Sequence, residues 1–124
     1  METQTGTFES IVLIDDDDDI NLIHQEILED AKLAKTIHVA NNGMEGLLLI
    51  SQFEIEKNPP KAKHLIFLDI NMPLMDGFDF LEEFEKMSDE FQSNFLIKIL
   101  TTSLDANDVM DASKSDSVSG YLLK

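Results

Sequence analysis

The chain has 124 residues, a net charge of −16 at pH 7, 25 acidic residues against nine lysines, and neither arginine nor cysteine. This length suits one domain with a hydrophobic core and is too short for two. The acidic excess argues against nucleic acid and anionic membranes as partners, because both are bound through basic groups. The lack of cysteine excludes disulfides and thiolate metal sites. The composition therefore predicts an acidic domain that binds metal cations or basic protein surfaces.

Residues 1–124 are expected to form a single domain without a linker or a repeat. No apolar run approaches the roughly 18 residues of a membrane-spanning helix. The first ten residues lack the basic start and apolar centre of a signal peptide. We therefore expect a cytoplasmic protein with no membrane contact.

Short apolar runs alternate with amphipathic segments in the first half of the chain. Residues 10–14 predict a buried strand, and the spacing of apolar positions over 19–30 predicts a helix. Asp17–Asp19 would lie at the helix start, where carboxylates cap free N–H groups. Residues 36–40 predict a second strand, and after an Asn-Asn-Gly turn residues 44–57 predict a second helix.

The second half repeats this alternation. Residues 64–71 are apolar at successive positions, which is typical of a central parallel strand covered on both faces. A third helix is predicted around 80–87, a fourth strand over 95–102, a short polar helix over 105–114 and a fifth strand over 118–124. The alternating order predicts an α/β fold: a doubly wound, five-stranded parallel sheet with helices on both faces.

Polar residues end four of the predicted strands. Asp15 and Asp16 end the first, Asp69 the third, Thr102 the fourth and Lys124 the fifth. Because the carboxyl ends of parallel strands meet at one edge, where ligands bind in such sheets, we expect these side chains to converge. Three adjacent carboxylates need a cation or raised pKa values, and Mg²⁺ is the natural match. An aspartate between such a metal and a lysine could accept a phosphoryl group.

The chain resembles the receiver domain of two-component response regulators over nearly its whole length. The resemblance rests on four motifs: IVLIDDD at 11–17, LIFLDINMPLMDG at 65–77, LTTS at 100–103 and GYLLK at 120–124. It implies a phosphorylation-dependent signalling switch of a two-component system or phosphorelay. The implied strand order is the flavodoxin-like 2-1-3-4-5.

The resemblance also assigns roles at the acidic edge. Asp69 would be the phosphorylated residue, and the Mg²⁺ ligands would be Asp16, Asp69 and the backbone carbonyl of Asn71, with Asp15 completing the acidic pair. A histidine kinase or a histidine phosphotransfer protein would donate the phosphoryl group, and slow hydrolysis would remove it. The chain would then be an autocatalytic phosphoacceptor and not an enzyme with turnover, acting on a protein target that the sequence does not identify.

Three further positions would couple phosphorylation to a change of shape. The resemblance gives Thr102 the switching hydroxyl, Lys124 the ammonium that binds phosphate, and Tyr121 the aromatic ring whose rotamer follows the switch. Ser103 would be the small residue that leaves the phosphoryl group access to the backbone. Plain core packing is the alternative interpretation of Tyr121.

Two other functions share part of this pattern. In a calcium-binding EF-hand loop, aspartates would alternate from Asp15 and Glu26 would take the twelfth place, but Ile20 stands where the loop needs glycine. A Mg²⁺-dependent phosphatase of the haloacid-dehalogenase type would also use an aspartyl phosphate. Such enzymes have a second aspartate two residues on, as general acid, where this chain has Asn71.

The receiver family usually continues past the lysine with a proline and a fifth helix beside the first. This sequence stops at Lys124, so we expect the usual fifth helix to be absent and apolar residues of the first, third and fifth strands to lie open. Such a chain would be less stable than an extended one, or would cover the face with another copy as a homodimer.

Overall fold

The computed structural model describes residues 8–101 and 117–123. These residues form five strands and four helices in the order β1 (Phe8–Ile14), α1 (Asp18–Ala31), β2 (Ala34–Ala40), α2 (Gly43–Ile50), β3 (His64–Asp69), α3 (Gly77–Glu85), α4 (Asp89–Gln92), β4 (Phe95–Thr101) and β5 (Val118–Leu123).

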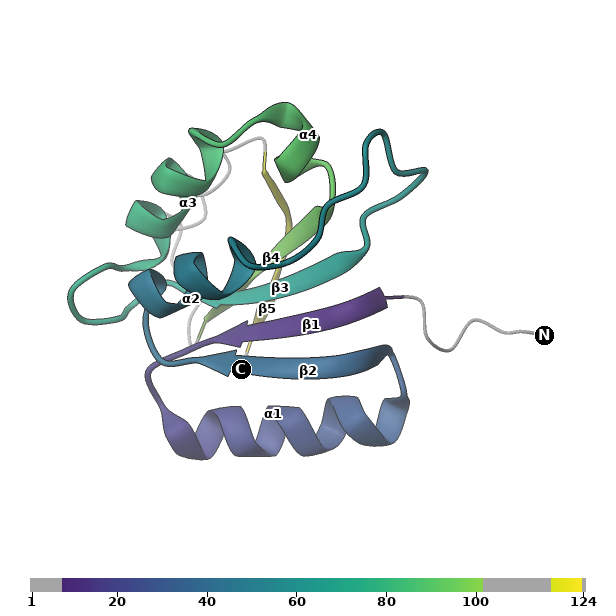
Figure 1. The fold of residues 1–124 in the computed structure, drawn as a ribbon. Coiled ribbons are helices and arrows are strands. Elements are labelled where there is room, and N and C mark those ends of the chain that lie inside the picture. Colours follow the sequence, from purple (N-terminus) through teal and green to yellow (C-terminus); the bar gives the residue numbers. More distant parts are fainter. Residues whose placement is uncertain (1–7, 102–116, 124) are drawn as a thin grey trace.

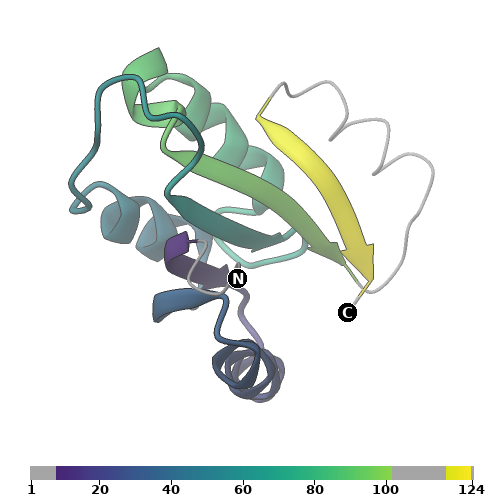
Figure 2. The same cartoon turned by 90° about the vertical axis from the view of Figure 1, so that its right-hand side faces the viewer.

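All five strands join one parallel sheet in the order β2-β1-β3-β4-β5. Helix α1 lies on one face of the sheet, and α2 and α3 lie on the other (Figure 1 and Figure 2). The predicted doubly wound fold and its strand order are therefore confirmed. No helix follows β5 within the described ranges.

The larger hydrophobic cluster lies between the sheet and helices α2 and α3. Ile14, Leu68 and Ile99 are aligned across three neighbouring strands, and each is at most 1% exposed. Phe80 and Phe84 from α3 pack over the same cluster. Because the central strands are covered on both faces, their apolar residues run on without alternation.

The α1 face of the sheet is less completely covered. Its smaller cluster centres on Ile11, Leu13 and Leu65. A cavity of about 220 Å³ lies between α1 and the strands, lined in part by Leu13, Ile27 and Leu122. Leu122 is 43% exposed and Leu13 only 1%. The expectation of open apolar residues thus holds for Leu122 in the fifth strand. It is wrong for Leu13 in the first strand and Leu65 in the third, because Leu28 of α1 packs against their cluster.

The second helix is shorter than the sequence predicts. The prediction ran over 44–57, whereas α2 ends at Ile50. The chain turns there because Phe53 folds back against the larger cluster. Asn94 then holds the backbone of Glu56 in both directions: its Oδ1 accepts from the Glu56 N–H (2.9 Å), and its Nδ2 donates to the Glu56 carbonyl (3.0 Å). Tertiary contacts therefore override the helical preference of this segment.

Helix α4 is a single turn that the sequence analysis missed. Ser88 caps it by accepting a hydrogen bond from the N–H of Phe91 (3.1 Å), a signal present in the sequence. The helix predicted over 105–114 lies outside the described residues. None of the described helices is both long and apolar enough to cross a bilayer.

His64, at the start of β3, is an imidazole buried among rings. It is 6% exposed, and its ring centroid lies 4.7 Å from that of Phe53 and 5.1 Å from that of Phe95. Neither ring nitrogen makes a hydrogen bond within the described part of the chain. Burial, and then the nearby Lys63 ammonium, hold the pKa of His64 below its ordinary value of 6.5. The folded protein therefore resists protonation at this position.

Acid is expected to destabilise the fold through His64. Above about pH 6.5 the imidazole is neutral in both states, and as the pH falls below this value the unfolded chain takes up the proton first. The free energy of unfolding should therefore decrease. Denaturant unfolding of the wild type and of His64→Phe at about pH 7.5 and about pH 5.5 isolates the effect, because phenylalanine keeps the ring contacts and does not titrate. If the free energy of unfolding decreases equally in the two proteins between these pH values, protonation of His64 is not the cause.

Candidate metal centre

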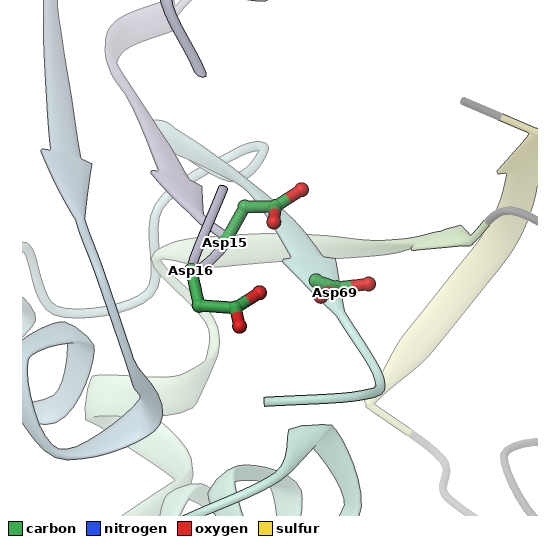
Figure 3. Close-up of side chains that lie close together, drawn as sticks. All are labelled: Asp15, Asp16 and Asp69. Atoms are coloured by element: carbon green, nitrogen blue, oxygen red, sulfur yellow. The ribbon is translucent and has the colours of Figure 1, made fainter. Parts of the chain in front are cut away.

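Three carboxylates meet at the carboxyl edge of the sheet. Asp15 and Asp16 follow β1 and Asp69 ends β3, and one carboxylate oxygen from each lies within 4.8 Å of the other two (Figure 3). Strands β1 and β3 pair directly, which brings their ends side by side. Asp15 and Asp69 are buried, at 2% and 5% exposed, whereas Asp16 is exposed. The cluster thus has two enclosed carboxylates and one that opens to solvent.

The charges of this cluster favour a bound cation. Three carboxylates so close together repel one another unless protons or a positive ion balance them. Every ligand atom offered is an oxygen, which suits Mg²⁺, an ion that takes one or two carboxylates and keeps several waters. The exposed side of Asp16 leaves space for such waters or for phosphate oxygens. These residues fit Mg²⁺.

The five aspartates after β1 have different structural roles in the turn and at the start of α1. Asp15 Oδ1 accepts a hydrogen bond from the N–H of Asp17 (3.0 Å), which holds the turn. Asp17 is the N-cap of α1, and its carboxylate accepts from the N–H groups of Asp19 (3.0 Å) and Ile20 (3.1 Å). The predicted helix-capping role is therefore confirmed for Asp17 alone. Asp18 and Asp19 lie in the first turn of α1, and Asp18 accepts a hydrogen bond from the Nδ2 of Asn41 (2.7 Å).

Sequence reasoning missed Asn21, which contacts this turn. It is 3% exposed, and its Nδ2 donates to the backbone carbonyl of Asp15 (2.8 Å). The apolar periodicity suggested that Ile23 and Ile27 face inward, but they are 52% and 58% exposed. A usable signal was the seven-residue spacing from Asn21 to Leu28, since two turns of helix separate positions on one face.

The start of α3 supports the other side of the cluster. The N–H of Gly77 donates to the carbonyl of Ile70 (2.8 Å), so the loop after β3 folds back on the strand end. A Cβ at Gly77 would lie 2.7 Å from the carbonyl oxygen of Asp69. Asp76 and Asp79 form a capping box at this helix start. The backbone of Asp69 is thus packed directly against α3.

The remaining predicted site residues lie at or near the same edge, as far as they are described. Asn71 is exposed and follows β3 by two residues. Tyr121 lies in β5, in register with Ile99 of β4, and packs half-buried against the larger cluster. Thr102, Ser103 and Lys124 lie outside the described residues.

Comparison with known proteins gives a consistent picture. A family model described as the response regulator receiver domain matches residues 11–124. The response regulator Rcp1 of Synechocystis sp. is 27% identical over 124 residues, which is 100% of this chain and 82% of Rcp1.

Solved structures resemble the fold closely. A two-component response regulator from Cytophaga hutchinsonii superposes with a TM-score of 0.81 at 25% identity, covering 95% of this chain and 86% of that one. The Mn²⁺-bound form of response regulator Rcp1 superposes with a TM-score of 0.73 at 27% identity, covering 94% of this chain and 81% of that one.

Proposed function

Since the chain belongs to the response regulator receiver domain family, we propose that it is a switch that accepts a phosphoryl group on Asp69 with Mg²⁺ bound beside it. One observation supports this most directly: the carboxylates of Asp15, Asp16 and Asp69 lie within 4.8 Å of one another at the edge where such sheets bind ligands. We propose that residues 1–124 form one receiver domain.

The proposed reaction needs only one nucleophile from this chain. A carboxylate oxygen of Asp69 attacks the phosphorus of a phosphohistidine, an O–P bond forms, and the P–N bond to the donor imidazole breaks. The released imidazole takes up a proton. In the later hydrolysis step, water attacks the phosphorus, the O–P bond to Asp69 breaks, and inorganic phosphate and the free carboxylate are released. Burial of Asp69 limits the access of water and keeps hydrolysis slow.

The acidic pair and Asn71 would hold the metal. When bound, Mg²⁺ neutralises the charge that develops on the transferring phosphoryl oxygens. Asp16 and Asp69 would provide carboxylate oxygens and Asn71 its backbone carbonyl. Asp15 is held by the hydrogen bond that its Oδ1 accepts from the N–H of Asp17. The Mn²⁺-bound form of Rcp1 supports a divalent cation in a related protein.

Phosphorylation would change the shape of the surface through the fourth and fifth strands. The phosphoryl group adds about −1.5 to −2 charge to an acidic site, so its oxygens need partners that donate hydrogen bonds or carry positive charge. Thr102 and Lys124 are the proposed partners, and Ser103 is the proposed small residue that leaves the phosphoryl group access to the backbone. Tyr121 is half-buried in β5, where its ring can follow the movement of Thr102.

The phosphoryl donor is proposed to be a histidine kinase or a histidine phosphotransfer protein in the cytoplasm. The chain is then a phosphoacceptor with autocatalytic phosphorylation and dephosphorylation, and the signal passes to a protein target. A phosphatase of the haloacid-dehalogenase type is less well supported, because the amide of Asn71 cannot serve as general acid. A calcium loop is less well supported because a strand, β1, precedes the aspartates.

Incubation with a small phosphodonor such as acetyl phosphate and Mg²⁺ is expected to add one phosphoryl group. Intact mass spectrometry should show this addition in the wild type and none in Asp69→Asn, since the amide is not a nucleophile of comparable strength. Removal of Mg²⁺ by a chelator should also abolish it, because the cation neutralises the phosphoryl charge.

Asp30→Asn provides the matched control. Asp30 is an exposed aspartate near the end of α1, remote from the carboxyl edge of the sheet, so its variant should be labelled like the wild type. Full labelling of Asp69→Asn would remove Asp69 from the proposed role. Labelling that persists without a divalent cation would contradict the proposed requirement for Mg²⁺.

A further inference from the structure

Helix α1 buries a polar residue and exposes apolar ones. Asn21 is the buried residue of this helix, at 3% exposed. Leu22 and Ile23, which follow it, are 57% and 52% exposed. A helix that only packed on the sheet would place these side chains the other way round. The position of Asn21 therefore serves something other than burial of apolar surface.

The amide of Asn21 holds one particular peptide group. Its Nδ2 donates to the carbonyl oxygen of Asp15 at 2.8 Å, and that carbonyl belongs to the peptide that joins Asp15 to Asp16. Two other hydrogen bonds hold the Asp15 side of the turn: its N–H donates to Ala40 (3.1 Å), and its Oδ1 accepts from Asp17 (3.0 Å). The Asn21 bond acts on the carbonyl of the following peptide, which leads directly to the Cα of Asp16.

This arrangement has a cost to stability. The Oδ1 atom of Asn21 is buried and makes no hydrogen bond within the described residues. An unpaired buried acceptor is unfavourable, and an aliphatic side chain would fill the same space without it. Natural sequences depart from such local preferences mainly at functional sites. We therefore expect asparagine to be present at this position because its Nδ2 group donates to the Asp15 carbonyl oxygen.

We propose that Asn21 is a positioning residue of the metal centre. Its Nδ2–H group holds the Asp15 carbonyl oxygen and so orients the Asp15–Asp16 peptide, which keeps both carboxylates turned toward Asp69. This inference rests on the proposed function, because it assigns Asn21 to the same Mg²⁺ site. Asn21 itself touches neither the metal nor the phosphoryl group.

The test compares two buried amides. Asn21→Leu removes the donor while nearly keeping the side-chain volume, and Mg²⁺ titration by calorimetry should show a dissociation constant about 10-fold weaker or more, as for other residues that orient ligands. Asn94→Leu is the matched control. Asn94 is 0% exposed and also donates through Nδ2, to the carbonyls of Glu56 (3.0 Å) and Glu90 (2.9 Å), away from the acidic cluster. It should lose stability and keep its Mg²⁺ affinity.

A second readout needs no metal. In the metal-free protein, the backbone amide of Asp16 should have a lower NMR order parameter in Asn21→Leu than in the wild type or in Asn94→Leu. If Asn21→Leu does not fold, Asn21→Ala takes its place in both measurements. Unchanged Mg²⁺ affinity in the Asn21 variant, with a wild type that binds, would overturn the role of Asn21 alone. A wild type that does not bind Mg²⁺ would overturn the metal centre and this inference with it.

Discussion

Phe84→Ala is expected to lower the free energy of unfolding by about 3–5 kcal/mol, the usual cost of removing a buried phenylalanine. Phe84 is 1% exposed, and its ring lies 6.2 Å from that of Phe80, 6.3 Å from that of Phe91 and 5.9 Å from that of Phe95. It joins α3, α4 and β4, so the cavity left behind cannot close by movement of one element. The loss is a large share of the roughly 5–15 kcal/mol that stabilises a typical domain.

Phe78→Ala on the same helix is the control for this effect. Phe78 is half-buried at the border of the larger cluster, so the same chemical change removes less apolar contact. Denaturant titrations of both variants measure the difference. If the two substitutions cost the same free energy, Phe84 does not have the central place in the core that its contacts indicate.

Gly77→Ala is expected to damage both the fold and the acidic cluster. The added Cβ would lie 2.7 Å from the carbonyl oxygen of Asp69 and 2.9 Å from the Cα of Ile70, and backbone atoms cannot yield as a side chain can. Overpacking of this kind costs about 1–3 kcal/mol. Relief requires α3 to move away from the end of β3, which displaces Asp69. Since a displacement of about 1 Å can reduce reactivity roughly 100-fold, the rate of the proposed phosphorylation of Asp69 should fall at least about tenfold.

Gly120→Ala tests whether close backbone contact is the cause. The nearest atom to a Cβ at Gly120 is the Nζ of Lys98, at 3.3 Å, the free end of a flexible side chain. This variant should melt near the wild-type temperature and be phosphorylated at the wild-type rate. Similar behaviour of the two glycine variants, in thermal melts and in phosphorylation kinetics, would refute the explanation.

The strands and the first helix were readable from apolar periodicity, and the strand order came from the family resemblance, whereas the end of α2 and the whole of α4 were not predicted. The apolar run before Asp69 reads directly as a central strand, since burial on both faces removes the alternation. The early end of α2 depends on Phe53 and Asn94, which contact residues far away in the sequence. Helix α4 was missed because its four residues are too few for a periodic pattern, although Ser88 marks its start.

The acidic cluster was predictable for a topological reason. In a parallel sheet the carboxyl ends of neighbouring strands share an edge, so the ends of β1 and β3 bring Asp15, Asp16 and Asp69 together in any chain with this order. Asn21 was not predictable in the same way. Its contact depends on the rotation of α1 about its own axis, and the exposed Ile23 and Ile27 suggest the wrong rotation.

All four strand pairings in the sheet are parallel, so none of them can begin as a local hairpin. β1 reaches β2 only across α1, and it reaches β3 only after α2 as well; closing such long loops slows folding. The acidic cluster draws on both β1 and β3, so a chain that has folded only its first β-α-β unit does not contain it. A cation at this cluster would bind only chains in which β1 and β3 have already paired, and would shift the folding equilibrium toward them by mass action.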